Sequence, residues 1–310
     1  MADKKSLRAA YGEALVELGK VNNRVVVMDA DLSKATMTCK FADAFPERFY
    51  DFGIAECNMV AEAAGFASCG FIPFVSTFAI FGTGRAYEIV RNSVCYPHAN
   101  VKLALSHAGL SVGEDGGSHQ SIEDIALMRV LPGMTIFTPC DAIETKKAVF
   151  AAAEIDGPVF LRTARPNSEI LTAESDPFVP GKASVLRDGG DVCIIAMGLM
   201  VQEAMHAAEL LAADGISAAV VNMSTIKPFD SETVLAMASK CRAVVTAEEH
   251  SIIGGLGSAV AETIAGKTTA RFDRVGVMDK FGRSGTPDEL FKLYGLTAEN
   301  IAEKCRALLK

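Results

Sequence analysis

The stretch 101–120, VKLALSHAGLSVGEDGGSHQ, joins a continuous apolar run to a glycine-rich polar loop. Its beginning, VKLALSH, has the pattern of a strand that is buried on both faces of a sheet. His107 closes this run, and open α/β sheets bind their ligands at the carboxyl ends of the strands. The GEDGG turn that follows is too polar and too flexible for a core. The stretch therefore predicts a buried parallel strand with a candidate site at its end.

Further apolar runs in the first half have the same form: RVVVMDA at 24–30, PFVSTF at 73–78, MTIFTPC at 134–140 and PVFLRTA at 158–164. Helical patterns such as NMVAEAAGFAS and RAYEIVRNSV separate them. This alternation favours a mainly parallel sheet with helices on both faces. The N-terminal MADKKSLRAAYGEALVELGK is predicted to be an amphipathic helix. It has no unbroken apolar region and no small-residue cleavage site, so it is not expected to be a signal peptide.

The segment 166–190 is rich in Pro, Gly, Ser and acidic residues and is interpreted as a linker. The strand–helix alternation then resumes with DVCIIAMG, SAAVVNMS, AVVTAEEH and RFDRVGVMD. We therefore expect an α/β protein with two doubly wound domains, at 1–167 and 191–310, and a linker at 168–190. The turn after Glu248, Glu249 and His250 lacks the last Gly or Ala of a dinucleotide-binding motif, which favours a tight packed turn.

Composition excludes several classes of protein. Half of the 310 residues are hydrophobic, 22% are charged, and the formal net charge is −8. Lys and Arg are scattered, so no basic surface for nucleic acid is expected, and no run approaches the roughly 18 apolar residues of a membrane span. The eight cysteines contain no C-x-x-C pair and predict reduced thiols in a cytoplasmic protein. The five histidines lack metal-site spacing, so no metal site is expected in this chain.

Glu56 is the first candidate for catalysis, because it stands at the start of a probable helix. An acid in the first turn of a helix often only complements the helix dipole. However, PFVSTFAIF places Phe74, Phe78 and Phe81 nearby in the sequence. A carboxylate close to aromatic rings can hold a flat heteroaromatic ring and exchange a proton with it. From these residues alone, ordinary core packing of the rings stays open.

Two further segments carry polar groups at the ends of predicted strands. His107, Asp115 and His119 share one loop with several backbone N–H groups, a set that suits polyhydroxylated or phosphorylated substrates. Arg162 and Arg165 follow the next strand and can bind a phosphate through a bidentate fork. A solvated loop and surface ion pairs are the alternatives for these two segments.

Taken together, the chain resembles the transketolase family of thiamine diphosphate enzymes. The resemblance is carried by MDADLS at 28–33, FGIAE at 52–56, PFVSTFAIF at 73–81, SHAGLSVGEDGGSHQ at 106–120, LMRVLPGMTIFTPCD at 127–141 and GPVFLRTARPN at 157–167. TIKPFD and AEEHSIIGGLGSAV resemble the C-terminal domain of the family less specifically. The resemblance implies a pyrimidine-binding domain followed by a transketolase C-terminal domain, as in the C-terminal half of a split transketolase.

The family's G-D-G motif and Asn pair, which hold Mg²⁺ and the diphosphate, do not occur in this sequence. The resemblance therefore implies a separate N-terminal subunit that carries the diphosphate-binding domain and the Mg²⁺. The expected assembly is an α₂β₂ heterotetramer, and this chain alone is expected to be inactive.

The resemblance also assigns roles by position. It implies that Glu56 is the catalytic carboxylate at N1′ of the aminopyrimidine, that Phe78 and Phe81 pack on this ring, and that Asp31 lies at the cofactor-side contact. The implied substrate-binding residues are His107, Asp115, His119 and Arg165, with His119 also catalytic. Ala35 replaces a phosphate-binding serine of the family, and Gly84 replaces a third aromatic residue.

The implied enzyme is a transferase that moves a two-carbon ketol unit from a ketose or ketose phosphate to an aldose or aldose phosphate, as in the pentose phosphate pathway. Two alternatives use the same cofactor: the β subunit of a 2-oxoacid dehydrogenase and a deoxyxylulose-phosphate-synthase-like enzyme. His107 together with His119 disfavours the dehydrogenase. A non-catalytic regulatory subunit is the alternative of another class, and Glu56 argues against it. An NAD-dependent enzyme is a more distant possibility.

Overall fold

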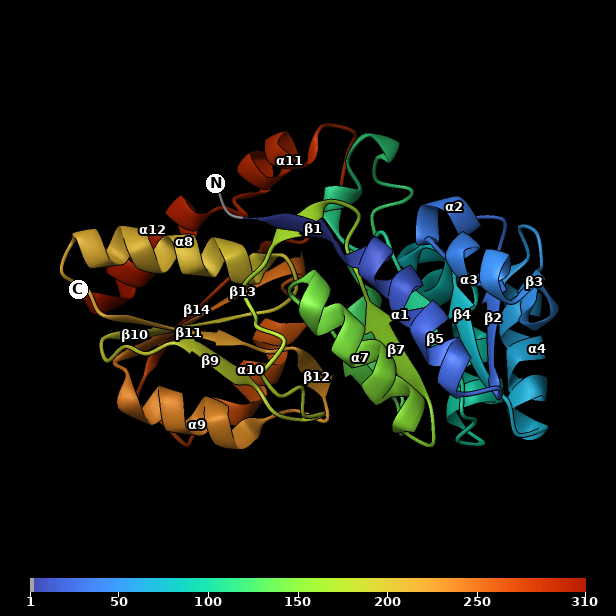
Figure 1. Ribbon diagram of the computed structural model, residues 1–310. Coiled ribbons are helices and arrows are strands. Elements are labelled where there is room, and N and C mark those ends of the chain that lie inside the picture. Colours follow the sequence, from blue (N-terminus) through green and yellow to red (C-terminus); the bar gives the residue numbers. More distant parts are fainter. Residues whose placement is uncertain (1–2) are drawn as a thin grey trace.

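The computed structural model describes residues 3–310 and arranges them in two α/β units that stand side by side (Figure 1). The unit drawn from blue to green contains the N-terminal half, and the unit drawn from yellow to red contains the C-terminal half. The predicted N-terminal helix is α1 (Leu7–Val21), preceded by β1 (Lys4–Ser6). Met1 and Ala2 of the predicted segment lie outside the described residues.

The first unit is built on a seven-stranded sheet with the order β12-β6-β7-β5-β4-β2-β3. In that order the strands span Thr225–Lys227, Thr135–Phe137, Val159–Arg162, Lys102–Leu105, Ile72–Ser76, Val25–Asp29 and Phe49–Asp51. All neighbouring strands are parallel except β12 and β6. The five apolar runs predicted in the first half form β2, β4, β5, β6 and β7.

The second unit is built on a five-stranded sheet with the order β14-β13-β10-β11-β9. These strands span Arg271–Val277, Ala243–Ser251, Val192–Ala196, Ala218–Asn222 and Ser184–Arg187. Only the edge strand β9 runs antiparallel to its neighbour. The predicted α/β class with two parallel-rich sheets is thereby confirmed.

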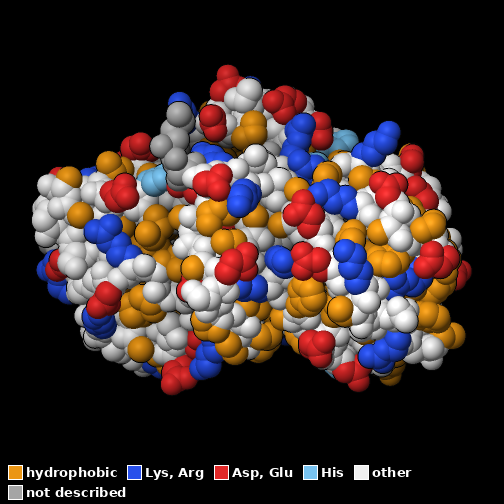
Figure 2. Space-filling view, viewed as in Figure 1, with side chains coloured by type: hydrophobic (Ala, Val, Ile, Leu, Met, Phe, Trp, Pro, Cys, Tyr) orange, Lys and Arg blue, Asp and Glu red, His pale blue; other side chains and the backbone are white. Residues whose placement is uncertain are grey.

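Helices cover both faces of each sheet (Figure 1). Besides α1 they are α2 (Ser33–Thr36), α3 (Cys39–Ala44), α4 (Glu56–Ser68), α5 (Tyr87–Ile89), α6 (Asp124–Arg129), α7 (Ala142–Glu154), α8 (Met200–Ala213), α9 (Ser231–Lys240), α10 (Leu256–Ile264), α11 (Pro287–Tyr294) and α12 (Ala298–Leu309). Within residues 3–310, none of these helices combines the length and the apolar character that crossing a bilayer requires. Figure 2 shows acidic and basic side chains interspersed over the viewed face rather than separated by sign.

Alternate side chains of a central strand enter different cores, as the two-residue period of a strand requires. Val25 and Val27 of β2 join the core under α1 and α7, whereas Val26 and Met28 join the core that contains residues of α4. The second of these cores continues into the other unit, where it includes Ile195 of β10. The two units therefore share apolar packing.

The segment predicted as a linker contains regular structure. β8 (Asn167–Glu169) pairs antiparallel with β1, and β9 forms the edge of the second sheet. An edge strand needs a hydrogen-bonding partner on one side only, so a short polar segment can take this place. β12 also crosses between the halves, because it comes from the second half of the chain and pairs with β6 of the first sheet. These pairings join residues far apart in sequence, which composition does not reveal.

The predicted helix at RAYEIVRNSV is irregular. Its centre is the short helix α5, which lies between π-helical segments at Phe81–Arg85 and Val90–Cys95. π-helical turns interrupt the regular α-helical hydrogen bonds and are frequent at functional sites. This irregularity places Phe81 and Arg85 in the same π-helical turn.

Candidate active site

Glu56 is buried at the first position of α4, with 1% of its surface exposed. Its Oε2 accepts a hydrogen bond from Nη1 of Arg85 at 2.7 Å. The Arg85 side chain is 48% exposed, and its guanidinium carbon lies 4.6 Å from the centroid of the Phe81 ring. A flat, hydrogen-bond-donating group is therefore held between a buried carboxylate and an aromatic ring.

Four rings form a continuous cluster beside this ion pair. Phe78 and Phe81 lie 6.0 Å apart and nearly parallel, at an interplanar angle of 15°. The His107 ring also stacks on the Phe78 ring, with the two ring centroids 3.8 Å apart. His119 meets the Phe81 ring edge-on at 5.3 Å. The structure thus brings four of the predicted site residues together from two segments of the chain.

Phe74 does not belong to this cluster, in contrast to the sequence-based interpretation of PFVSTFAIF. It is fully buried in the core that also contains Tyr11 and Leu15 of α1. The reason is the position along the chain: Phe74 lies inside β4, whereas Phe78 follows the strand at its carboxyl end. Ordinary core packing is thus correct for Phe74.

His107 is held in a strained and dry environment. Its φ is 58°, in the left-handed region that non-glycine residues seldom adopt, and only 3% of its surface is exposed. Its Nδ1 lies 2.9 Å from the hydroxyl of Ser106. Burial and the neighbouring positive charges of Arg8 and Arg165 lower the pKa of His107 to about 3. The imidazole is therefore neutral near pH 7 and offers a hydrogen bond rather than a charge.

Two arginines form a cationic corner next to His107. Nη1 of Arg8 donates to the carbonyl of Ala35 at 2.5 Å, and its Nη2 donates to the carbonyl of Arg165 at 3.0 Å. Arg165 Nη1 reaches Oε2 of Glu114 at 3.1 Å. Burial, and after it the charge of Arg165, lower the pKa of Arg8. Such a corner suits a phosphate or another anionic group.

Arg8 was not predicted as a site residue. It occupies the first turn of α1, where a positive charge opposes the helix dipole and an acidic residue is favoured. A basic residue in the first turn of a helix is unfavourable, and this marks Arg8 in the sequence. The sequence does not show which groups the Arg8 side chain contacts. Only the fold brings Arg8 beside Ala35 and Arg165.

Arg162 has a different role from the phosphate binding considered for it. It is buried, and its Nε donates to Oδ2 of Asp124 at 2.6 Å while its Nη2 donates to the carbonyl of Glu249 at 3.0 Å. The interpretation was wrong because Arg162 is the last residue of β7 and points between the two units. Arg165, three residues further on, lies in the loop beyond the strand.

The loop after β5 carries Asp115 and His119. Asp115 ends the 3₁₀-helical turn Leu110–Asp115 with an exposed side chain, and His119 is half-buried with its Nδ1 3.0 Å from the hydroxyl of Ser118. Asp115 is therefore accessible to a ligand, whereas His119 is fixed against the Phe81 ring. Their substrate contacts stay predictions.

Asp31 lies on the neighbouring loop, after β2. It is exposed and has a positive φ of 61°. Its N–H and that of Gly53 donate to the same Oδ1 of Asp51, at 3.1 Å and 2.9 Å. The loop of Asp31 is thereby tied to the turn that leads into Glu56, which is compatible with a shared cofactor contact.

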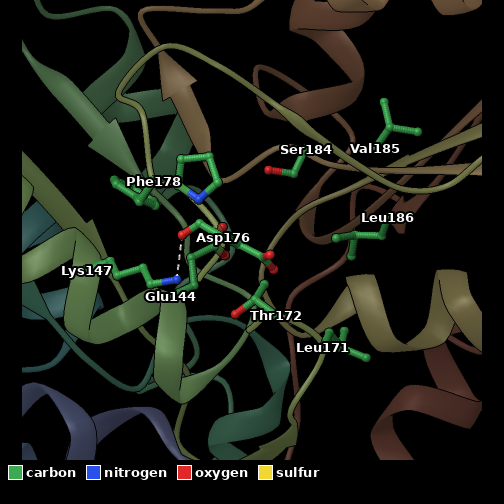
Figure 3. A pocket seen from close by; sticks show the side chains of 10 residues that line it. Glu144, Lys147, Leu171, Thr172, Asp176, Phe178, Ser184, Val185 and Leu186 are labelled. Carbon is green, nitrogen blue, oxygen red and sulfur yellow. Dashed lines mark hydrogen bonds between the residues drawn. The ribbon is translucent and has the colours of Figure 1, made fainter. Parts of the chain in front are cut away.

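A separate cavity of about 370 Å³ lies between α7, the segment 171–178 and β9 (Figure 3). Lys147 is anchored on its wall, because its Nζ donates to the carbonyls of Ala173 at 2.6 Å and Asp176 at 2.7 Å. The walls are built from residues other than the predicted site residues. The candidate active site that we consider is the cluster of Glu56 and the four rings, which is separate from this cavity.

Comparison with known proteins agrees with the fold. The family model for the transketolase pyrimidine-binding domain matches residues 3–169, and the model for the transketolase C-terminal domain matches residues 181–301. A protein of Methanocaldococcus jannaschii assigned as a transketolase C-terminal section is 50% identical over 309 residues, covering 99% of this chain and 97% of that protein. The 6-deoxy-6-sulfo-D-fructose transketolase subunit of a Clostridium species is 45% identical, covering 95% of this chain and 92% of that protein.

A solved structure shows the same arrangement of both units. It is a split-gene transketolase described as an inactive β4 tetramer, with 50% identity, a TM-score of 0.91 and coverage of 99% of each chain. The predicted order of a pyrimidine-binding domain and a C-terminal domain is confirmed by the two family models. The chain therefore belongs to the transketolase family, as a C-terminal section made of the pyrimidine-binding and C-terminal domains.

Proposed function

We propose that this chain is the C-terminal subunit of a thiamine-diphosphate-dependent transketolase and works with a separate N-terminal subunit. The complex transfers a two-carbon ketol unit from a ketose to an aldose. The observation that carries the proposal is the arrangement of Glu56, Arg85 and Phe81, in which a buried carboxylate and a ring enclose a flat donor group. A pyrimidine ring that is protonated at a ring nitrogen is also flat and also donates a hydrogen bond in its plane.

The residues fit the pyrimidine end of thiamine diphosphate. Glu56 accepts the hydrogen bond of the ring nitrogen, and its burial excludes water that would compete for this contact. Phe78 and Phe81 supply the apolar face on which the ring packs. Asp31 stands on the adjacent loop, at the cofactor-side contact. When bound, the cofactor supplies an electron sink for breaking and forming a carbon–carbon bond next to a carbonyl.

The cationic corner is proposed to select substrates with a terminal anion. Arg165 and Arg8 hold the phosphate or a similar group, while Asp115, His107 and His119 contact the hydroxyl groups of the sugar. His119 is also proposed to move a proton, and its position against the ring cluster supports this role. A relative named for a sulfonated sugar makes a sulfonate a second candidate for the terminal group.

The diphosphate and its Mg²⁺ are assigned to the partner subunit. Across residues 3–310, no group of three or more His, Cys, Asp or Glu side chains is arranged to hold a metal ion. The related split-gene protein is an inactive tetramer of the β type alone, which agrees with a site that is completed by another polypeptide. We propose an α₂β₂ heterotetramer as the active assembly.

The deciding experiment reconstitutes the chain with its N-terminal partner, thiamine diphosphate and Mg²⁺. We expect ketol transfer from a ketose phosphate to an aldose phosphate, and no transfer by either subunit alone. Activity on pyruvate without ketol transfer would instead identify a 2-oxoacid dehydrogenase or a deoxyxylulose-phosphate-synthase-like enzyme. Full turnover by a complex that carries Glu56→Ala would identify a non-catalytic subunit.

A place in cytoplasmic carbohydrate metabolism, including the pentose phosphate pathway, belongs to the same proposal. It is supported by the substrate chemistry that the anion corner suits. The comparison of phosphorylated with sulfonated ketoses in the reconstituted assay tests it, since a pentose phosphate enzyme prefers the phosphorylated sugar.

A further inference from the structure

We propose that Glu249 of the C-terminal domain is a positioning residue for the substrate loop, which we define as residues 107–119. The proposal rests on the proposed function, because the loop carries the predicted substrate residues His107, Asp115 and His119. In this view the C-terminal domain sets the geometry of the sugar site without contacting the substrate.

The substrate loop adopts a backbone conformation that needs support beyond its own turns. Gly109, Gly113 and Gly116 have φ values of 81°, 84° and 78°, which only glycine adopts readily. Glycine loses more backbone freedom on ordering than any other residue, so this conformation is costly unless other contacts fix it. The loop therefore depends on neighbours outside itself.

Glu249 supplies the central contact. The residue belongs to β13, is 2% exposed, and its carboxylate accepts a hydrogen bond from the backbone N–H of Ser111 in the middle of the loop. A Cβ atom at Gly109 would collide with this carboxylate, so the chain approaches Glu249 as closely as a glycine allows. The loop is thus built around a side chain of the other domain.

A residue of the first unit, Arg162, in turn holds the backbone of Glu249 in place. Arg162 donates to the backbone carbonyl of Glu249 at 3.0 Å and to the carboxylate of Asp124 at 2.6 Å. Asp124 begins α6, shortly after the loop ends. The buried arginine therefore couples the strand that carries Glu249 to the helix that follows the substrate loop.

A second part of the C-terminal domain packs on the other side of the loop. Nε2 of Gln120 donates to the carbonyl of Arg283 at 3.0 Å. A Cβ atom at Gly117 would lie 2.7 Å from the carbonyl oxygen of Gly282, and one at Gly116 would lie 2.6 Å from Oγ of Ser284. The loop is enclosed between β13 and the segment before α11. Glu249 is its polar anchor from β13, while Gln120 and Arg165 bond the carbonyls of the loop from the first unit.

Glu248 offers a matched control on the same strand. It is also buried, but its carboxylate accepts from the N–H groups of Leu256 and Gly257 at 2.7 Å and 2.8 Å, at the start of α10. Glu248→Ala removes an acceptor of the same size and burial within the C-terminal domain. Glu249→Gln keeps an oxygen acceptor for Ser111 and serves as the conservative variant.

The first test measures amide hydrogen exchange in the reconstituted complex without substrate. In Glu249→Ala we expect faster exchange over residues 109–119, because the N–H of Ser111 loses its acceptor. In Glu248→Ala we expect faster exchange at the start of α10 and an unchanged loop. Equal exchange of the loop in Glu249→Ala and in the wild type would overturn the proposal, whether or not the complex is active.

The second test measures ketol transfer by the same variants. For Glu249→Ala we expect the KM of the ketose phosphate to rise about tenfold, since a buried donor without its partner is strongly unfavourable. The affinity for thiamine diphosphate should change less than twofold. Glu249→Gln should recover most of the loss, and Glu248→Ala should keep the wild-type KM.

Two results of the kinetic test contradict the inference. Equal KM values for Glu249→Ala and Glu248→Ala would make Glu249 a structural residue only, and a parallel loss of cofactor affinity would place its effect at the cofactor. A wild-type complex without ketol transfer refutes the proposed function instead, and the exchange measurement then still decides whether Glu249 fixes the loop.

Discussion

Glu56 and Arg85 form an ion pair of 2.7 Å in which the carboxylate is buried and the arginine is half exposed. Arg85 compensates the negative charge of Glu56, whose burial without a partner would destabilise the fold. The same guanidinium covers the Phe81 ring, so the ion pair occupies the place that we assign to the cofactor's pyrimidine. Cofactor binding then requires Arg85 to leave Glu56, and the arginine competes with the cofactor for one carboxylate.

This competition predicts that Arg85→Ala tightens the binding of thiamine diphosphate. A partly exposed ion pair contributes little free energy, so we expect the Kd of the reconstituted complex to fall about threefold. Isothermal titration calorimetry measures the change. Arg91→Ala, which removes another exposed arginine nearby, should leave the Kd unaltered. Weaker binding by Arg85→Ala would show that the arginine contacts the bound cofactor.

Glu56→Gln removes the charge that the ring nitrogen requires while it keeps the size of the side chain. We expect kcat for ketol transfer to fall about 10³-fold, a typical loss for a group that controls proton transfer. The control is Glu62→Gln, an exposed glutamate on the same helix, for which we expect wild-type kcat. Size-exclusion chromatography must show intact complexes in both cases. A Glu56→Gln enzyme with normal kcat would remove Glu56 from the mechanism.

The cationic corner predicts a loss that depends on the substrate. Arg165→Ala should lower kcat/KM for a ketose phosphate by about 10- to 100-fold, the range for a hydrogen bond to a charged group. Arg8→Ala should act in the same direction. A ketose without a terminal anion should lose less than threefold in either variant. Equal losses for both kinds of ketose would mean that these arginines support the fold rather than the anion.

The buried Glu248 predicts a pH-dependent stability. Burial raises the pKa of Glu248 to about 7, above its ordinary value of 4.5. The folded chain therefore binds this proton more tightly than the unfolded chain, and the destabilisation by the buried charge is absent below about pH 4.5 and complete above about pH 7. Glu248→Gln cannot ionise, so its melting temperature relative to the wild type should increase as pH rises from 5 to 8.

Differential scanning calorimetry of both chains across this pH range measures the effect. Glu289→Gln is the control, because hydrogen bonds from Thr286 lower the pKa of Glu289 below its ordinary value. Its difference from the wild type should stay flat between pH 5 and 8. A flat difference for Glu248→Gln as well would contradict a raised pKa in the folded chain.

Much of the fold follows from short-range patterns. The apolar runs of β2, β4 and β5 are recognised as strands in the sequence, because a strand buried on both faces needs apolar residues throughout its length. The ends of these strands converge at one edge of the sheet, and His107 was predicted as a candidate from its place at such an end. Asp31 and the role of Phe78 followed from the resemblance to the transketolase family. The pairing of β12 with β6 was not predicted, because it joins the two halves of the chain.

Local residue patterns thus establish the α/β class, the family and the chemical groups available at the strand ends. Long-range packing decides which of these groups face a ligand. Arg162 and Arg165 look equivalent in the sequence, yet one neutralises Asp124 in the interior and the other borders the site. Glu249 acts on Ser111 across 138 residues of chain. Such contacts depend on how the two units dock, which no local pattern encodes, because the free energy of burying a charge depends on the partner that folding brings to it.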